Sequence, residues 1–214
     1  MAWILRKNGI KVGVMKPFAT SSGVYSNNYR SSDTAFLAKA ADINESDKML
    51  NPVYFPLPSS PLMAAEILHK TVDMETVTKK FGILKKKYDF TLVEGIGGVM
   101  VPITKKISVL DVMKIMKLPT IIVSNPRLGS INHTILTINA CKAKKIPIFG
   151  LIFNQMPRNP TLVESMTPYY IEKLTNIRSI SVIPFMHNCN FQKVGTHLGK
   201  TSIMRKMISR LTLN

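Results

Sequence analysis

The segment that follows the apolar run 88–94 has the residue types of a phosphate or metal site. The run ends in Glu94, and a glycine-rich turn, Gly95-Ile96-Gly97-Gly98, follows at once. In an open α/β sheet, ligands bind at the carboxyl ends of the strands. A carboxylate there can hold Mg²⁺, and glycines let the backbone approach a phosphate or a substrate closely. A solvated glutamate before an ordinary turn is the alternative, and this segment alone does not decide between the two.

Lys16 stands at the corresponding position after another apolar run, 10–15, and begins the sequence KPFAT. If the two runs are parallel strands, Lys16 and Glu94 reach the same edge of the sheet. An ammonium group there can neutralise a carboxylate or a phosphoryl group as negative charge develops, and Pro17 fixes the turn that aims it. The alternative is a lysine on an ordinary surface.

Asp33 lies in a pattern typical of a helix start, Ser31-Ser32-Asp33-Thr34. Serine and aspartate cap helices at such places, and capping alone explains these residue types. The functional interpretation makes Asp33 a second carboxylate ligand of Mg²⁺ beside Glu94.

Residues 121–132 lead from an apolar run through Arg127, Leu128 and Gly129 into a helix that is predicted to begin at Ser130. The N–H groups of a helix start bind anions, carboxylates included. The alternative is a capped helix behind a tight glycine turn, in which His133 packs or caps and takes no part in catalysis.

The elements that must position these residues alternate along the chain. Apolar runs rich in β-branched residues predict strands, and helical spacing separates them. Strands are predicted at 10–15, 88–94, 119–124, 146–153 and 179–184, and helices at 32–41, 61–70, 74–87, 108–117, 130–145, 161–175 and 202–213. The alternation predicts an α/β fold, a three-layer, mostly parallel sheet with helices on both faces. The proline-rich segment 51–61 is predicted to be a connection.

The composition excludes some classes of protein. The chain has 214 residues, 45% of them apolar, which suffices for a single domain spanning residues 1–214. It has no membrane-span or signal-peptide pattern, so a cytoplasmic protein without a membrane partner is expected, with Cys141 and Cys189 as free thiols. The formal charge of +17 favours anionic partners. The lysines form short scattered groups near predicted helix ends, which favours a solvated basic face over a nucleic-acid groove.

Several segments taken together resemble the dethiobiotin synthetase family of P-loop NTPases. They occur in the family's order and at its spacing, from the first residue to about Met186, and EGxGG and LGxINH are the specific signatures. The segments are KPFAT at 16–20, SSD at 31–33, PLPSSPLMAA at 56–65, VEGIGG at 93–98, RLGSINHTILT at 127–137 and FN at 153–154.

This resemblance implies an activity and a set of partners. Members of the family are ligases of biotin biosynthesis. They use ATP and Mg²⁺ to close carbonated 7,8-diaminopelargonic acid, formed with bicarbonate or CO₂, into the cyclic urea dethiobiotin. The resemblance also implies a homodimer whose active site lies at the subunit interface.

The resemblance assigns roles to residues of this chain. Lys16 is the catalytic residue, stabilising the carbamate and the phosphoryl group transferred to it, and Asp33 and Glu94 are the Mg²⁺ ligands. The substrate-binding residues are Thr20, Gly97, Gly98, Gly129, Ser130, Ile131 and Asn132, the last four holding the substrate carboxylate at the helix start. The nucleotide-binding residues are Glu94, Gly95, Ile96, Gly97, Asn154, Gln155, Pro184, Phe185 and Met186, with Asn154 reading the adenine edge.

The family also has a phosphate-binding loop of the form GxDTxVGKT after its first strand, and no segment of this sequence matches it. Residues 1–7, followed by Asn8-Gly9, have the pattern of the last turns of a helix, and in the family the helix after the loop would run into them. The resemblance therefore implies that roughly twenty residues, the loop among them, are absent before Met1. We therefore expect an N-terminally truncated domain with its first strand missing and with little activity. An internal methionine taken as the start is the favoured explanation; a truncated gene and a replaced loop are the others.

The segment 195–201, GTHLGKT, superficially resembles a phosphate loop. It has three residues between its glycines where the motif requires four, and it follows no predicted strand. We expect a connection to the last helix here.

Two other functions compete with the biotin-pathway interpretation. An ATPase of the partitioning or cobyrinate-amidation type would share the fold and a carboxylate at a strand end, but KPFAT and LGSINH argue against it. A non-catalytic basic module that binds nucleic acid or a protein partner would explain the charge, and it predicts salt-sensitive binding.

Overall fold

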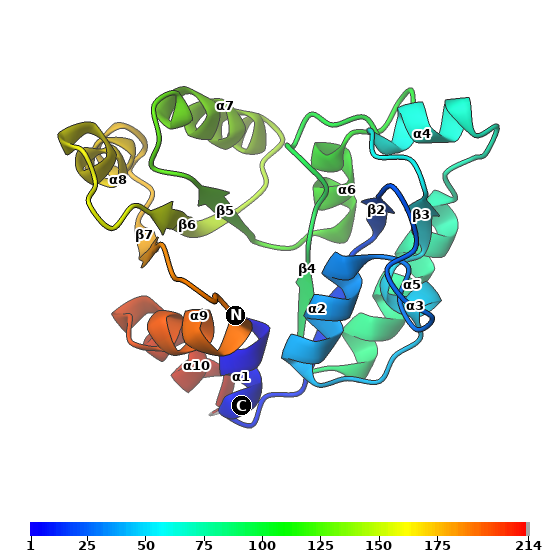
Figure 1. Cartoon of the computed structure of the whole chain (residues 1–214), viewed down its shortest axis with the longest axis horizontal. Coiled ribbons are helices and arrows are strands. Elements are labelled where there is room, and N and C mark those ends of the chain that lie inside the picture. The colour runs from blue at the N-terminus through cyan, green and yellow to red at the C-terminus, as the bar shows by residue number, and fades with distance from the viewer. Residues whose placement is uncertain (213–214) are drawn as a thin grey trace. The chain divides into compact units, whose positions relative to one another are not determined.

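A computed structural model describes residues 1–212, which divide into two compact units (Figure 1). One unit comprises residues 2–116, and the other begins at Lys117 and also includes Met1. The four pairs of named strands in the described residues are all parallel, and they form three sheets: β1-β4, β2-β3 and β5-β6-β7. The parallel α/β prediction is confirmed, while the prediction of a single domain stays a prediction.

The first unit is built around the parallel pair β1-β4. Helices α2 and α5 both pack on β1, and all four residues of β1 are buried, which explains its unbroken apolar sequence. The elements of this unit are α1 (Ala2–Lys7), β1 (Val12–Met15), β2 (Phe18–Thr20), α2 (Ser32–Ala41), α3 (Asp47–Leu50), β3 (Val53–Phe55), α4 (Pro61–Ile67), α5 (Met74–Lys87), β4 (Phe90–Val93) and α6 (Val109–Met116).

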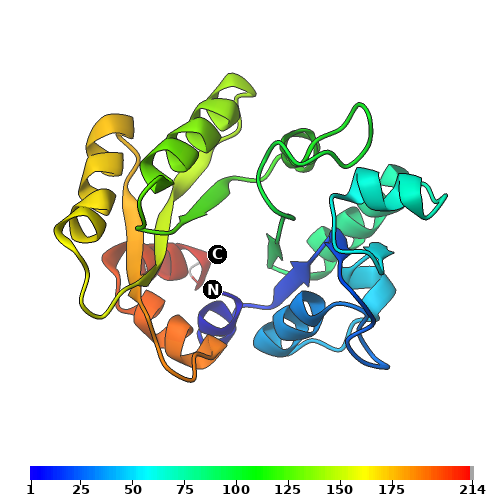
Figure 2. The same ribbon diagram turned by 45° about the horizontal axis from the view of Figure 1, so that its top comes forward.

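The second unit is a three-stranded sheet with helices packed on it. Ile138 of α7 and Ile171 of α8 meet Ile122, Leu151 and Phe153 of the strands in one buried cluster, so both helices cover the same face (Figure 2). The elements are β5 (Thr120–Ser124), α7 (Ser130–Ala143), β6 (Ile148–Met156), α8 (Leu162–Thr175), β7 (Ser179–Pro184), α9 (Phe191–Gly199) and α10 (Ser202–Thr212). No helix of the described residues 1–212 is long and apolar enough to cross a membrane.

The predicted strands and helices are all present, with ends that differ by a few residues, but two predicted connections were wrong. The segment 51–61 contains β3, which pairs with β2, because Pro52 and Pro56 flank the strand and remove none of its own N–H groups. The segment 195–201 lies largely in α9, whose start is capped by the Asn190 side chain accepting from the Lys193 N–H. A helix through this segment leaves no glycine-rich phosphate loop there, as expected.

Gly13 in β1 has no room for a side chain. A Cβ at this position would lie 2.7 Å from Cδ2 and 2.9 Å from Cγ of Tyr88. We expect Gly13→Ala to lower the free energy of unfolding by about 1–3 kcal/mol, because Tyr88 must shift. Gly82 in α5 is the matched control, because its Cβ would meet nothing within 4 Å and alanine gains helix propensity. Urea unfolding followed by circular dichroism compares the two; equal stabilities would contradict the tight contact.

A network of side chains joins the end of α5 to the loop before α3. The Tyr88 hydroxyl donates to Glu45 Oε1 at 2.7 Å, and Lys87 forms an ion pair with the same oxygen. Burial raises the pKa of Glu45, but hydrogen bonds from Lys87 and Tyr88 and the Lys87 charge together outweigh it and lower this pKa. Burial, followed by the hydrogen bond to Glu45 and its charge, raises the pKa of Tyr88.

The lowered pKa of Glu45 predicts that this residue contributes to stability in a pH-dependent way. Glu45 contributes above the pKa of an unfolded glutamate, about 4.3, and the contribution disappears as the pH falls through the lower folded value. Glu45→Gln should therefore be less stable than wild type at pH 7, with a difference that shrinks below about pH 4. Urea unfolding at both pH values measures this, and a difference independent of pH would contradict the network.

Candidate active site

Lys16, Asp33 and Glu94 meet at the carboxyl end of the β1-β4 pair. Lys16 Nζ lies 2.8 Å from Glu94 Oε1 and 3.1 Å from Asp33 Oδ2, and it also donates to the carbonyl oxygen of Gly95 at 2.8 Å. These three acceptors match the three N–H donors of an ammonium group. The Lys16 side chain is 6% exposed, whereas the side chains of Asp33 and Glu94 are 52% and 48% exposed. The lysine is therefore a buried cation that the two carboxylates and the carbonyl hold in place.

The parallel register of β1 and β4 explains why Lys16 and Glu94 lie together. Met15 is paired with Val93, and the Glu94 N–H continues the ladder to the Met15 carbonyl at 2.9 Å. The next residue of each strand then leaves the sheet at the same edge. The geometry excludes the alternative of a surface lysine, since Lys16 is 5% exposed.

Asp33 reaches Lys16 from the first turn of α2. Ser31 occupies the N-cap position, but its side chain makes no capping hydrogen bond within the described chain. The predicted helix start with a serine at the N-cap is therefore present, although the serine side chain does not cap the helix. Asp33 does more than occupy a helix start, because its carboxylate pairs with a buried ammonium group. Its position in the first turn also suits a negative charge.

The two carboxylates fit Mg²⁺. This ion prefers hard oxygen ligands and is commonly held by one or two carboxylates together with water and phosphate oxygens. No group of three or more His, Cys, Asp or Glu residues suited to a metal occurs in residues 1–212. Asp33 and Glu94 share one ammonium charge, which leaves a net negative charge for a cation.

The turn after β4 exposes its backbone. Gly95, Gly97 and Gly98 are exposed, and Gly97 has a φ of +59°. A Cβ at Gly97 would lie 2.9 Å from Cγ2 of Val101, so both conformation and space require glycine. Thr20 is half-buried, and its hydroxyl donates to the Ser59 carbonyl at 2.9 Å, which connects β2 to the start of α4.

In the second unit, the start of α7 has features of an anion site. Gly129 is the N-cap residue, with a φ of +91° and no side chain to cap the helix. Ser130 is 8% exposed, and its Oγ finds no hydrogen-bond partner among the described residues. Ile131 is half-buried and Asn132 is exposed. A helix start without a side-chain cap suits an anion, and this role of residues 129–132 stays a prediction.

Also in the second unit, the ends of β6 and β7 bring the predicted base-binding residues together. The register shifts between Phe153 and Met156, where Gln155 has a φ of +60° and its N–H donates to Asn154 Oδ1 at 3.0 Å. The Phe185 N–H donates to the Met156 carbonyl at 2.7 Å. Asn154 and Gln155 therefore lie beside the segment Pro184–Met186.

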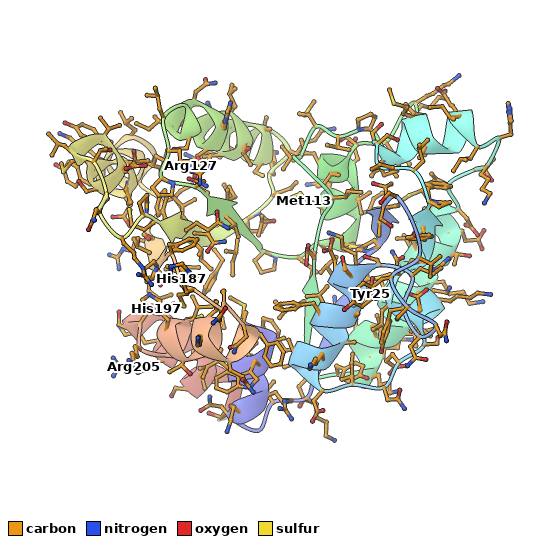
Figure 3. All side chains as sticks on the ribbon, viewed as in Figure 1. Tyr25, Met113, Arg127, His187, His197 and Arg205 are labelled. Atoms are coloured by element: carbon orange, nitrogen blue, oxygen red, sulfur yellow. The ribbon has the colours of Figure 1, made fainter. Side chains whose placement is uncertain are left out.

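Aromatic surface is available beyond β7. The ring of Phe185 is 45% exposed and packs edge-on against the His187 ring, with 5.2 Å between ring centroids. Figure 3 labels His187 in this segment and Arg127 in the segment that leads into α7. Lys16, Thr20, Asp33 and residues 94–98 belong to the first unit, and the other predicted site residues belong to the second. The chemical roles of both groups stay predictions.

Asn51 was missed in the sequence, although its side chain contacts the Lys16 backbone. Its Nδ2 donates to the Lys16 carbonyl at 2.7 Å. The sequence shows only an asparagine before Pro52, in a segment predicted to be a connection, and this pattern does not indicate a contact with Lys16.

Comparisons with known proteins identify the family. An AAA-domain family model matches residues 1–193. The chain is 36% identical to the ATP-dependent dethiobiotin synthetase BioD of Nitrosopumilus maritimus, over 91% of this chain and 86% of the relative. It is also 36% identical to the proteins of that name from Thermodesulfovibrio yellowstonii and Bacillus subtilis 168, over 95% of this chain and 88% and 86% of the relatives. The chain belongs to the dethiobiotin synthetase family.

The fold agrees with this family membership. A ParA family ATPase from Chlorobium tepidum matches with a TM-score of 0.50 at 19% identity, covering 100% of this chain and 92% of that chain. At this identity the match concerns the fold alone, which is an α/β fold.

The pair of carboxylates predicts a measurable cation site. Asp33→Asn and Glu94→Gln should each weaken binding of Mn²⁺, used as a paramagnetic substitute for Mg²⁺, by roughly ten-fold or more, because each removes a charged oxygen ligand. Electron paramagnetic resonance of free Mn²⁺ measures the binding. Glu66→Gln is the control, since Glu66 is an exposed carboxylate paired with Lys105. Equal Mn²⁺ affinity in all variants would argue against a metal at this edge.

Proposed function

We propose that this protein is an ATP- and Mg²⁺-dependent dethiobiotin synthetase, a cytoplasmic ligase of biotin biosynthesis. Its substrates would be 7,8-diaminopelargonic acid and bicarbonate or CO₂, which it joins and closes into the cyclic urea dethiobiotin. The single observation that carries the proposal is the buried ammonium of Lys16, bonded to Asp33, Glu94 and Gly95 at the end of a parallel strand pair. Family membership supplies the chemistry for which this arrangement is suited.

The reaction needs cationic groups that are already in place. When bound, ATP supplies the phosphoryl group that makes a carbamate oxygen a leaving group, and Mg²⁺ balances the phosphate charge. The second amine of the substrate would then attack the carbamate carbon. The C–O bond to the phosphoryl group would break, inorganic phosphate and the amine proton would leave, and the urea ring would close. Positioning and charge stabilisation account for most catalysis in phosphoryl transfer.

Residues of the first unit would act on the reacting groups. Lys16 would stabilise the negative charge of the carbamate and of the transferred phosphoryl group, and its burial strengthens this effect because little water screens it. Asp33 and Glu94 would hold Mg²⁺ through their half-exposed carboxylates. Thr20 would hydrogen-bond the substrate, and the backbone at Gly97 and Gly98 would approach the reacting groups.

Two regions of the second unit would contact ligands. The start of α7, from Gly129 to Asn132, would hold the substrate carboxylate, and the Ser130 hydroxyl would gain the partner that it lacks. Asn154 and Gln155 would contact the adenine, with Pro184–Met186 lining it. A homodimer would complete the site across the subunit interface.

The assay follows dethiobiotin formation from 7,8-diaminopelargonic acid, bicarbonate and Mg·ATP. It compares the 214-residue chain with the same chain extended upstream in its reading frame, and the more active form is used for the variants. Lys16→Met should lower kcat by about 100-fold or more, because the group that stabilises the developing charge is removed. Lys106→Met is the control, since Lys106 is exposed in the loop between β4 and α6.

Two results would contradict the proposed function. One is the absence of dethiobiotin from both forms of the chain under conditions where a relative of the family is active. The other is a Lys16→Met variant as active as Lys106→Met, since the buried ammonium would then have no part in the reaction.

A further inference from the structure

The backbone of Lys16 is held on both sides by the end of α3, through its last residue Leu50 and through Asn51, which follows it. The Lys16 N–H donates to the Leu50 carbonyl at 2.8 Å, and Asn51 Nδ2 donates to the Lys16 carbonyl at 2.7 Å. The same amide nitrogen also donates to the Val53 carbonyl at 3.1 Å. Both polar backbone groups of the candidate catalytic lysine are therefore bonded to one short segment.

The Asn51 side chain is suited to this task and to little else. It is 0% exposed, and both hydrogens of its amide are used, one on each carbonyl. Its Oδ1 finds no partner among the described residues, and an unmet acceptor costs about 1–3 kcal/mol. Asn51 Oδ1 therefore stays without a partner, while its Nδ2 donates to the Lys16 carbonyl just before Pro17.

The main chain of Asn51 is bonded in turn to the segment that carries Asp33. Arg30 Nη2 donates to the Asn51 carbonyl at 2.6 Å, and the Arg30 guanidinium pairs with Asp47 of α3. The Arg30 N–H also donates to Asp47 Oδ1 at 3.1 Å. Because Arg30 comes directly before Ser31, the N-cap of α2, this bond ties the start of α2 to the same segment that holds Lys16.

We propose that Asn51 is a positioning residue, which fixes the Lys16 backbone so that the ammonium group stays between Asp33 and Glu94. A lysine side chain has many rotamers, so its Nζ keeps a defined position only if the backbone below it does not move. Displacement of a reacting group by about 1 Å can reduce a rate by about 100-fold. The effect of Asn51 on catalysis rests on the proposed function, whereas its effect on the position of Lys16 can be measured without substrate.

The test treats the folded full chain with an amine-reactive ester. The rate at which each lysine is acylated is then measured by digesting the protein and quantifying the peptides by mass spectrometry. In the wild type, the buried Lys16 should react far more slowly than the exposed Lys39 and Lys79. In Asn51→Leu, which has a similar volume and no donor, acylation of Lys16 should be about ten-fold faster, because its restraint is lost. The rates at Lys39 and Lys79 should not change.

A control separates positioning from general loss of stability. Ile138→Val removes a buried methylene from α7 in the second unit and should cost about 0.5–1.5 kcal/mol. It should leave the Lys16 rate unchanged. If Asn51→Leu fails to fold, Arg30→Met replaces it, because it removes the bond to the Asn51 carbonyl and should speed Lys16 acylation by a few-fold.

An unchanged Lys16 rate in a folded Asn51→Leu, or an equal increase in Ile138→Val, would overturn the proposal. In the synthesis assay, Asn51→Leu should lower kcat by about 100-fold with little change in KM for 7,8-diaminopelargonic acid. Unchanged kcat would also overturn it. Faster Lys16 acylation in Asn51→Leu, together with no dethiobiotin from either form of the wild-type chain, would instead contradict the proposed function and leave the positioning role intact.

Discussion

The ammonium group of Lys16 lies where water cannot solvate it, and this constraint organises the first unit. A buried charge is tolerated only if its hydrogen bonds are met within the protein. The three acceptors come from Asp33, in the first turn of α2, and from Glu94 and Gly95, which directly follow β4. The β1-β4 register, the start of α2 and the turn after β4 must therefore all be in place before the lysine can be buried.

The short elements near Lys16 are stabilised by their contacts with one another and not by their own length. Helix α3 has four residues, and β2 and β3 have three each, so none of them would persist alone. They are held together by bonds through Asn51 and by the β2-β3 ladder. Their common effect is to fix the turn at Lys16 and Pro17.

The second unit uses backbone conformation where the first uses charge. Gly129 adopts a positive φ at the start of α7, and Gln155 adopts one in the irregular end of β6. A non-glycine residue in this region is uncommon and often marks a functional position. Both residues lie at the end of a regular element, and the resemblance predicts ligand contacts at both. The proposed contacts are therefore made by the ends of strands and helices and not by their interiors.

The sequence by itself determined the α/β class, the major strands and helices, and the meeting of Lys16 with Glu94, because these depend on local patterns. Apolar runs with β-branched residues form strands, helical spacing forms helices, and residues that follow parallel strands share an edge. The plain connection at 51–61 was wrong, and the N-cap residue Ser31 makes no side-chain capping bond within the described chain. Strand β3 exists because β2 lies beside it, and its pairing partner is more than thirty residues away.

Only the tertiary structure decided that Lys16 is buried and that Asn51 holds it. No pattern in the sequence distinguishes a lysine at a strand end that faces water from one enclosed by two carboxylates. Likewise, an asparagine before a proline resembles any turn residue until the carbonyl groups of Lys16 and Val53 are placed against its amide. Local propensity acts over a few residues, whereas the burial of a charge depends on groups brought together from distant parts of the chain.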